Sequence, residues 1–372
     1  FASTRMLTVL LLGFSSGIPL ALTGGTLQAW MASAGVDLTI IGAFSLVGLP
    51  YSLKFFWAPF MDRYVPPFLG RRRGWMLTAQ IGVMAAITAM AFSNPGSFPL
   101  AIAALALGLS FFSASQDIAI DAYNTESLLK AEYGIGSALY TNGYRLAMLV
   151  AGAGALILAD HLSWKQVYLI MAAVMLVGIV AALWASEPEL PSARPADLKQ
   201  AVVLPFRDFF SRRGSVEVLA FMLLYRLDYN LTMAMTTPFV LQLGFTKTDI
   251  GVVTKGFGLG ALILGSLIGG ALILKFGLKR SLQVFGIAQA ASGLSYMLLA
   301  RLGHAYGMMA LAITVENLCG GMADAALSAF MMSLCDKRFT ASQFALITSF
   351  MALSRYAAAA PSGFLAKSAG WE

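Results

Sequence analysis

The chain has 372 residues, of which 58% are hydrophobic and only 12% are charged, with a formal net charge of +7. Soluble domains carry about 25% charged residues, and a water-soluble core cannot bury so large an apolar fraction. The composition therefore excludes an ordinary water-soluble protein. It indicates an all-α membrane protein with many spans.

Apolar stretches long enough to cross a membrane follow one another along the chain. The first one resembles a signal peptide, but we expect it to remain because many more follow. The chain begins at Phe1 and ends at "SAGWE", where another helix should start, so we expect a twelfth span beyond the last residue. The eleven predicted spans lie at about 6–32, 39–60, 75–93, 98–122, 135–159, 164–185, 215–242, 247–275, 281–300, 305–334 and 340–366.

Basic residues are divided unequally between the two sets of loops. When the loops are assigned alternately to the two sides, one side holds sixteen Lys and Arg residues and the other holds four. Cytoplasmic loops carry the basic excess in membrane proteins, so we expect the N-terminus in the cytoplasm. The positive net charge then reflects topology, and nucleic acid is not expected as a partner.

A long polar stretch and an internal repeat divide the chain. The stretch predicts an N-terminal six-helix half (1–186), a cytoplasmic linker (187–214) and a C-terminal half (215–372) with five visible spans. An offset of about 207 residues lays one half on the other and places Asp117 on Asp324. Parallel six-helix repeats are the plan of major facilitator transporters, whose substrate site lies near the midplane between the halves.

The loop between the second and third spans resembles the loop signature of that superfamily. It reads "APFMDRYVPPFLGRRRGW" (58–75), an acid and arginine followed by glycine and several arginines, here lengthened by "YVPPFL". Such a loop anchors topology, and its charges can also hold the cytoplasmic ends of the helices closed. The predicted gate residues are Asp62, Arg63, Gly70, Arg71, Arg72 and Arg73.

Ten ionisable side chains fall inside the predicted spans. Each costs roughly 2.5–3.5 kcal/mol at a helix centre, so they must face a wet cavity or one another. Ion pairs that only lock the bundle remain possible for any single residue, but apolar residues build a structural core at lower cost. The ten are Lys54, Arg145, Arg226, Lys255, Arg355, Asp117, Asp121, Asp228, Glu316 and Asp324.

A central cavity of both charge signs suits a large polar solute that carries carboxylates and amines, since arginine grips a carboxylate through two hydrogen bonds. For each uncharged polar side chain taken alone, helix packing or anchoring at the membrane interface is the more common role. The uncharged side chains predicted to line the cavity are Gln28, Tyr51, Trp57, Gln116, Tyr144, Tyr229 and Asn317.

Asp117 and Asp121 stand one helical turn apart on the same face, at the end of a long uncharged stretch. Two carboxylates this close do not both ionise easily, so one can carry a proton. We expect proton-coupled import, with Asp117, Asp121, Asp228 and Asp324 as candidate proton carriers. Arg145, on the next helix, is the first candidate for the cation that pairs with the two acids.

Five segments closely resemble the AmpG family of muropeptide permeases from Gram-negative inner membranes. They are "LLLGFSSGIPLALTGGTLQAWM" (10–31), "GAFSLVGLPYSLKFFWAPFMDRYVPPFLGRRRGW" (42–75), "SASQDIAIDA" (113–122), "YRLAMLVAG" (144–152) and "ENLCGGM" (316–322). The resemblance covers nearly the whole chain. A more distant similarity, through the "SQDI" element, is to acetyl-CoA transporters.

The AmpG resemblance implies a major facilitator fold and proton-driven import of GlcNAc–anhydroMurNAc, with or without peptide, for peptidoglycan recycling and β-lactamase induction. It departs in the seventh span, where Asp228 stands one residue earlier than the family pattern places its acid, about 100° around the helix. To the central cavity the resemblance assigns Lys54, Asp117, Asp121, Arg145, Lys255, Glu316 and Arg355.

Other functions are less compatible with the sequence. An acetyl-CoA-type carrier would favour a cavity with a basic excess, whereas acids and bases are nearly balanced here. A membrane acyltransferase needs a partnered His or Ser, but His161 and His304 stand apart in short loops. No cofactor and no metal site are expected. The expected partners are the muropeptide, protons and the lipid bilayer, and we expect a monomer in the inner membrane.

Overall fold

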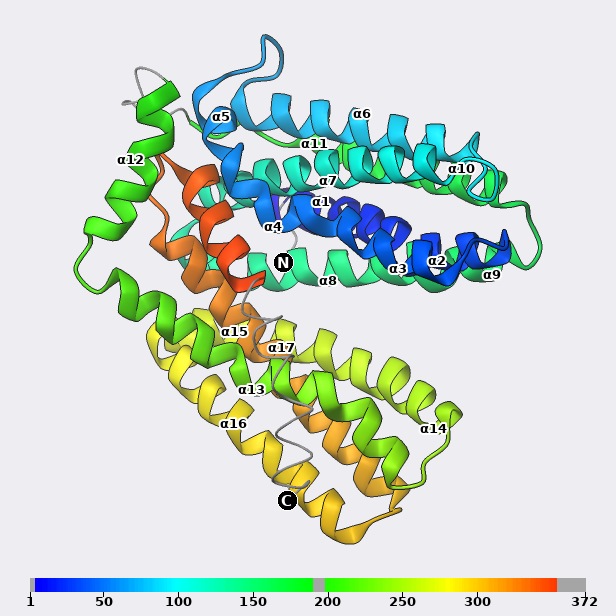
Figure 1. The fold of residues 1–372 in the computed structure, drawn as a ribbon. Helices are drawn as coiled ribbons and strands as arrows, with labels where there is room; N and C mark the ends of the chain where they lie inside the picture. The colour runs from blue at the N-terminus through cyan, green and yellow to red at the C-terminus, as the bar shows by residue number, and fades with distance from the viewer. Residues whose placement is uncertain (1–3, 190–197, 353–372) are drawn as a thin grey trace. The chain divides into compact units, whose positions relative to one another are not determined.

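The computed structural model describes residues 4–189 and 198–352, except for the side chains of Leu198, Ala234, Lys247 and Lys255 (Figure 1). Throughout these ranges the chain forms helices and connecting loops, without a β-strand. The predicted all-α class is therefore confirmed.

The residue contacts divide the chain into two compact units. The first consists of Phe1–Leu128, Leu139–Phe209 and Cys335–Ser349, and the second of Leu129–Ala138, Phe210–Leu334 and Phe350–Glu372. The division at 187–214 into two sequence halves stays a prediction.

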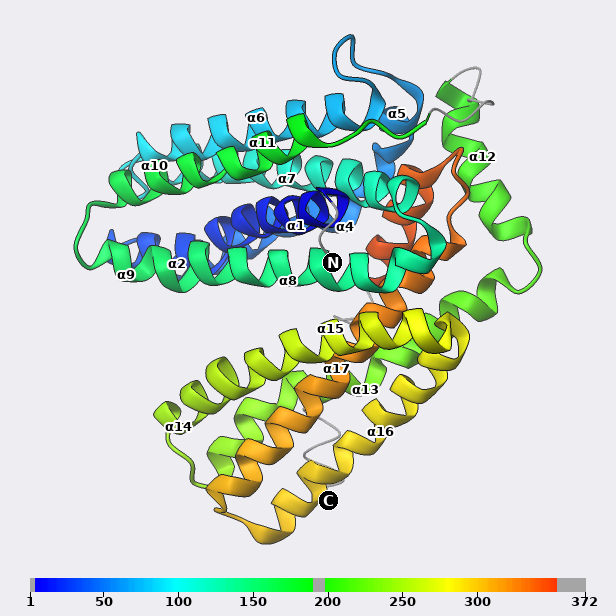
Figure 2. The same cartoon turned by 180° about the vertical axis from the view of Figure 1, so that it is seen from behind.

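The first unit is built on long antiparallel helices that run side by side in both views (Figures 1 and 2). The second span is broken into five short pieces, from α3 to α5. The elements are α1 (Thr4–Thr23), α2 (Gly25–Ser33), α3 (Leu38–Ala43), η1 (Phe44–Gly48), α4 (Leu49–Leu53), η2 (Lys54–Phe56), α5 (Ala58–Arg63), α6 (Arg71–Ala91), α7 (Pro99–Ser127), η4 (Val150–Gly154), α9 (Ala155–Ala159), α10 (Trp164–Val174), α11 (Leu176–Trp184) and α12 (Leu198–Ser211).

The second unit packs α17 against α15, η5, α16 and α13. Helix α8 (Tyr133–Leu149) contributes residues to both units, and residues 340–352 are helical as well. The remaining elements are η3 (Lys130–Glu132), α13 (Ser215–Gln242), α14 (Lys247–Val252), η5 (Val253–Gly258), α15 (Leu259–Phe276), α16 (Leu278–Leu302) and α17 (Tyr306–Leu334).

Eight helical segments within the described ranges are long and apolar enough to cross a membrane. They correspond to predicted spans one to six, eight and nine. Helices α13 and α17, at the predicted seventh and tenth spans, are of spanning length but are not among these eight, and both carry charged residues near their middle. The eleventh predicted span is helical up to residue 352, and its remainder lies outside the described residues.

The linker contains a helix that the sequence analysis did not anticipate. Helix α12 buries Ala201, Pro205 and Phe209, which recur every four residues on one face, and leaves Val202, Val203 and Phe210 exposed. The period is that of an amphipathic helix. The Pro-rich composition of 185–214 concealed this pattern.

Two membrane-length segments that correspond in the two sequence halves depart from regular α-helix. The second span contains the 3₁₀ turns η1 and η2, and the eighth contains the π-helical segment η5. Irregular helices at corresponding positions of the halves mark binding sites in transporters, and π-helical turns gather at functional sites. Lys54 begins η2, and Lys255 lies within η5.

Glycines set the closest helix contacts in both units. A Cβ atom at Gly13 or Gly17 of α1 would collide with the backbone carbonyl of Tyr140 or Tyr144 in α8. In the second unit a Cβ at Gly265 or Gly269 of α15 would meet the backbone of α17. Small residues one turn apart let membrane helices approach in this way. Gly265 and Gly269 therefore allow α15 to pack closely against α17.

Candidate functional site

Lys54 and Asp121 form a buried ion pair in the first unit. Lys54 opens η2, and Asp121 lies near the C-terminal end of α7. The Lys54 Nζ and Asp121 Oδ2 atoms are 3.3 Å apart, and their side chains are only 8% and 11% exposed. Arg145 was the first expected cation for these acids, but the cation that lies against Asp121 is Lys54.

Gln116, the residue before Asp117, lies at the centre of a polar cluster between α1, α6 and α7. Its Nε2 atom is 3.4 Å from the hydroxyl oxygens of both Ser15 and Ser16, and Gln80 Nε2 is 3.5 Å from Ser15 Oγ. Asp117 is half-buried, and its buried Oδ1 atom has no hydrogen-bond partner among the described residues. An unsatisfied buried carboxylate oxygen of this kind is available to a solute, to water or to a proton.

The other predicted cavity residues of the first unit differ in exposure. Tyr51 keeps a buried hydroxyl without a hydrogen-bond partner within the described ranges. Tyr144 and Arg145 are half-buried on α8, and Gln28 is exposed on α2. Trp57 donates its ring N–H to Ser115 Oγ at 3.0 Å. Their predicted roles in solute binding remain predictions.

Arg226 and Asp324 form the corresponding ion pair of the second unit. The Arg226 Nη1 and Asp324 Oδ1 atoms are 2.5 Å apart and join α13 to α17. The guanidinium also lies 4.4 Å from the ring centroid of Tyr229, in a cation–π contact. Asp324, the sequence counterpart of Asp117, is thus paired with a cation. Its predicted role as a proton carrier stays a prediction.

Glu316 is fully buried on α17 and is held by two polar residues of α16. Its Oε1 atom is 2.6 Å from Gln289 Nε2, and its Oε2 atom is 2.5 Å from Ser292 Oγ. Asp228, on α13, has a buried Oδ2 atom without a partner among the described residues. Asn317, also predicted for the cavity, donates to Ile313 O of its own helix at 2.7 Å.

Sequence reasoning did not name Gln289 and Ser292. The available signal was two polar residues three positions apart in an otherwise apolar span, which puts them on one helix face. Two other predicted residues are not placed: the side chain of Lys255 and the whole of Arg355 lie outside the described part of the structure.

The predicted gate motif forms a buried cluster of Asp62, Arg71, Arg72 and Glu126, here called the Asp62 cluster. Arg72 Nη2 donates to Asp62 Oδ1 at 2.8 Å and to Glu126 Oε1 at 2.5 Å, and Arg71 Nη2 donates to Glu126 Oε1 at 2.9 Å. Asp62 and both arginines are 1% exposed. Both arginines also bind Glu126, which is not among the predicted gate residues.

Asp62 also holds the start of the helix formed by residues 340–352. The backbone N–H and the hydroxyl of Ser342 donate to Asp62 Oδ2 at 2.8 and 2.7 Å, and the N–H of Ala341 lies 3.3 Å from Oδ1. A carboxylate at a helix N-terminus satisfies free N–H groups and interacts favourably with the helix dipole. One side chain therefore joins the loop after the second span to the start of the eleventh.

Gly70 and Glu187 shape and cap the start of α6, which carries the two arginines of the Asp62 cluster. The carboxylate of Glu187 accepts the backbone N–H groups of Arg72 and Arg73 at 2.8 and 3.0 Å. Gly70 has φ +86°, which favours glycine, and a Cβ there would meet the Glu187 side chain. Arg73 donates to the carbonyls of Ala182 and Leu183 at the end of α11.

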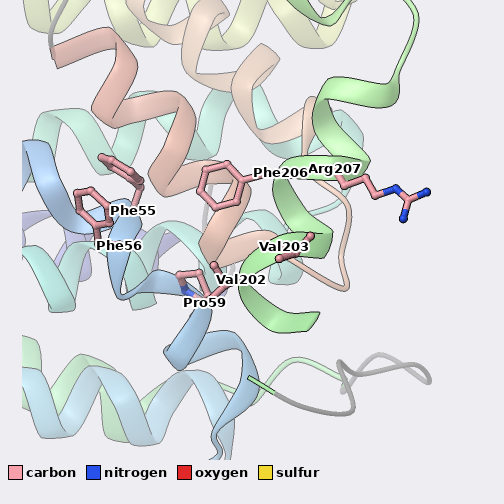
Figure 3. Close-up of a pocket in the computed structure, with 7 residues that line it drawn as sticks. All are labelled: Phe55, Phe56, Pro59, Val202, Val203, Phe206 and Arg207. Carbon is pink, nitrogen blue, oxygen red and sulfur yellow. The ribbon is translucent and has the colours of Figure 1, made fainter. Parts of the chain in front are cut away.

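The first unit also contains an apolar groove, whose lining does not suit a polar solute. It has a volume of about 480 Å³ and lies between α12 and the end of the second span. Figure 3 shows the guanidinium of Arg207, the one charged residue among the described residues that line the groove, pointing away from Phe55 and Phe56. The buried ion pairs and amides described above, and not this groove, are the candidate transport residues of each unit.

Charged and amide side chains buried inside membrane-length helices, beside irregular helical turns, are typical of polytopic membrane transporters. A family model described as the Major Facilitator Superfamily matches residues 9–359. The solved proton:xylose symporter XylE has a TM-score of 0.69 at 10% identity, covering 98% of this chain and 89% of its own. The transporter FucP, solved in the outward conformation, has a TM-score of 0.70 at 14% identity, covering 98% and 92%.

Relatives found by sequence similarity indicate the family of this chain within the superfamily. The chain is 47% identical over 374 residues to the anhydromuropeptide permease of Escherichia coli, covering 100% of this chain and 76% of that protein. It is 31% identical over 382 residues to the putative transporter AmpG 4 of Rickettsia felis, covering 100% and 92%. The chain therefore belongs to the major facilitator superfamily and, within it, to the AmpG family of permeases.

Proposed function

We propose that this protein imports anhydro-muropeptides, GlcNAc–anhydroMurNAc with or without its stem peptide, from the periplasm to the cytoplasm. The observation that carries the proposal is 47% identity along the whole chain to the Escherichia coli anhydromuropeptide permease. The protein lies in a bacterial inner membrane as a monomer with a cytoplasmic N-terminus, and it serves peptidoglycan recycling and β-lactamase induction.

The buried polar groups suit this solute. The ion pairs Lys54–Asp121 and Arg226–Asp324 present both signs of charge, one pair in each unit. A muropeptide carries carboxylates, an amine and many sugar hydroxyls, and arginine and lysine bind such carboxylates by charge-assisted hydrogen bonds. Gln116 and the unpartnered oxygen of Asp117 add hydrogen-bonding groups for hydroxyls.

Proton coupling is the second part of the proposal. Asp121 pairs with Lys54, whereas Asp117, one turn away, keeps a buried oxygen without a hydrogen bond among the described residues. Two acids that share one cation alternate readily between one and two negative charges, since the second charge lacks a partner of its own. Asp117 is therefore the acid of this pair that takes up and releases the proton.

Uptake into proteoliposomes tests both parts. Labelled GlcNAc–anhydroMurNAc and its tripeptide form are offered with and without an imposed pH gradient. We expect gradient-driven accumulation of both by the natural chain, and loss of the gradient effect in Asp117→Asn/Asp121→Asn. Asp160→Asn, at an exposed acid after α9, is the matched control. No gradient-dependent uptake of either solute would defeat the proposal.

A further inference from the structure

Ser292 makes two contacts that one hydroxyl proton does not satisfy. Its Oγ atom is 2.6 Å from the backbone carbonyl oxygen of Gln289 and 2.5 Å from Glu316 Oε2. Both distances are those of O–H···O hydrogen bonds. A serine hydroxyl donates only one proton, and a carbonyl oxygen and an ionised carboxylate donate none. A protonated Glu316 supplies the second proton that these two contacts require.

A neutral Glu316 satisfies the three shortest contacts of the cluster in turn. Its carboxylic acid O–H donates to Ser292 Oγ, and the Ser292 O–H donates to the Gln289 carbonyl. The Gln289 side-chain N–H group then donates to the other Glu316 oxygen at 2.6 Å. An ionised Glu316 would leave two oxygen atoms in close contact without a proton between them, which is repulsive in a buried site.

The charges around Glu316 agree with this assignment. Glu316 is fully buried, and none of the described lysine or arginine side chains forms an ion pair with it. From α13 it faces Asp228 within electrostatic range, while Arg226 of the same helix is bound to Asp324. Ionising Glu316 would put a second negative charge beside Asp228 in a medium of low dielectric constant.

The remaining groups that face Glu316 are neutral in their ordinary state. They are Tyr296 on α16 and Cys319 on α17 itself. From η5, Lys255 is the one ionisable residue, and its side chain lies outside those described. Among the described residues, the surroundings of Glu316 thus contain one acid without an ion-pair partner, Asp228. They also contain hydrogen-bonding groups that suit a neutral Glu316.

We propose that Glu316 is a proton carrier of the transport cycle, held protonated on α17 by Ser292 and Gln289. This rests on the proton-coupled import proposed above and adds a carrier in the second unit to Asp117 in the first. The Glu316 carboxylate takes the proton from one side of the membrane, and the proton leaves when α16 and α17 no longer align Ser292 with Glu316.

Infrared spectroscopy of the purified full chain tests the protonation directly and does not depend on transport. At neutral pH we expect a carbonyl stretching component of a protonated carboxylic acid that is missing from Glu316→Gln. The component should persist in Glu217→Gln, which changes an exposed glutamate of α13, and shift in frequency in Ser292→Ala, where the acid loses its acceptor. A Glu316→Gln spectrum identical to the natural one would overturn the proposal.

Transport separates this inference from the proposed function. Glutamine reproduces the hydrogen bonds of a neutral glutamic acid but carries no carboxyl proton, so Glu316→Gln separates proton transfer from these contacts. It should lose accumulation driven by the pH gradient, whereas Glu217→Gln accumulates the solute. Gradient-driven accumulation by Glu316→Gln equal to that of the natural chain would overturn the carrier role. Failure of the natural chain to take up the solute would instead defeat the proposed function.

Discussion

Asp62 binds Arg72 Nη2 at 2.8 Å with one carboxylate oxygen and the hydroxyl and backbone N–H of Ser342 with the other. Counted from Asp62, Arg72 lies 10 residues and Ser342 lies 280 residues further along the chain. A single buried carboxylate thus binds both an arginine of the predicted gate motif and the N-terminus of a distant helix. Removing its charge should weaken both contacts at once.

Asp62→Asn should release the start of the 340–352 helix. Hydrogen bonds to a charged group contribute about 1.5–3 kcal/mol each, and the neutral amide weakens those to Arg72 and Ser342. Spin labels at Phe68 and Lys337, both exposed in the first unit, should report a broader distance distribution in this variant. Asp37→Asn, at an exposed acid bonded only within its own turn, is the control. Equal distributions in all three proteins would contradict the role of Asp62 in holding this helix.

Lys54→Met should destabilise the protein more than the double variant Lys54→Met/Asp121→Asn. Removing one partner of a buried ion pair leaves an uncompensated charge and costs roughly 3–5 kcal/mol, whereas replacing both partners by neutral groups costs much less. Thermal unfolding in detergent measures the three proteins. A double variant no more stable than Lys54→Met would show that the pair with Asp121 does not determine the effect.

Glu187→Gln should lower stability by about 1 kcal/mol, as the loss of a helix cap does. The carboxylate accepts two N–H groups at the start of α6, whereas the amide offers only one oxygen. The measurement is the melting temperature, with Glu189→Gln, at an exposed glutamate two residues later, as the matched control. Equal melting temperatures of the two variants would contradict the cap.

Gly265→Ala and Gly260→Ala should have opposite effects on the same helix. A Cβ at Gly265 collides with the backbone of Leu318, whereas a Cβ at Gly260 meets open space. Overpacking costs typically 1–3 kcal/mol, while alanine in place of a glycine in a helix interior stabilises by about 1 kcal/mol. Thermal unfolding compares the two, and a Gly265→Ala protein as stable as Gly260→Ala would show that α15 and α17 are not in close contact.

The sequence identifies the charged residues inside the spans but not which of them form ion pairs. The ionisable residues inside the spans can be recognised from the sequence because each interrupts a long apolar stretch. Their pairing cannot, because it depends on how each helix is rotated against its neighbours. Arg145 was expected beside the acids of α7, and Lys54 lies there because η2 breaks the second span at that residue.

The sequence by itself determined the class of protein and the positions of the eight spans found among the described residues. Hydrophobic length and loop charge are local properties, so they can be recognised without the fold. Only the tertiary structure decided that Glu126 binds Arg71 and Arg72, that Glu187 accepts the N–H groups at the start of α6, and that Gln289 and Ser292 hold Glu316. These contacts join residues tens of positions apart, and the packing of helices, which no local pattern encodes, brings them within hydrogen-bonding distance.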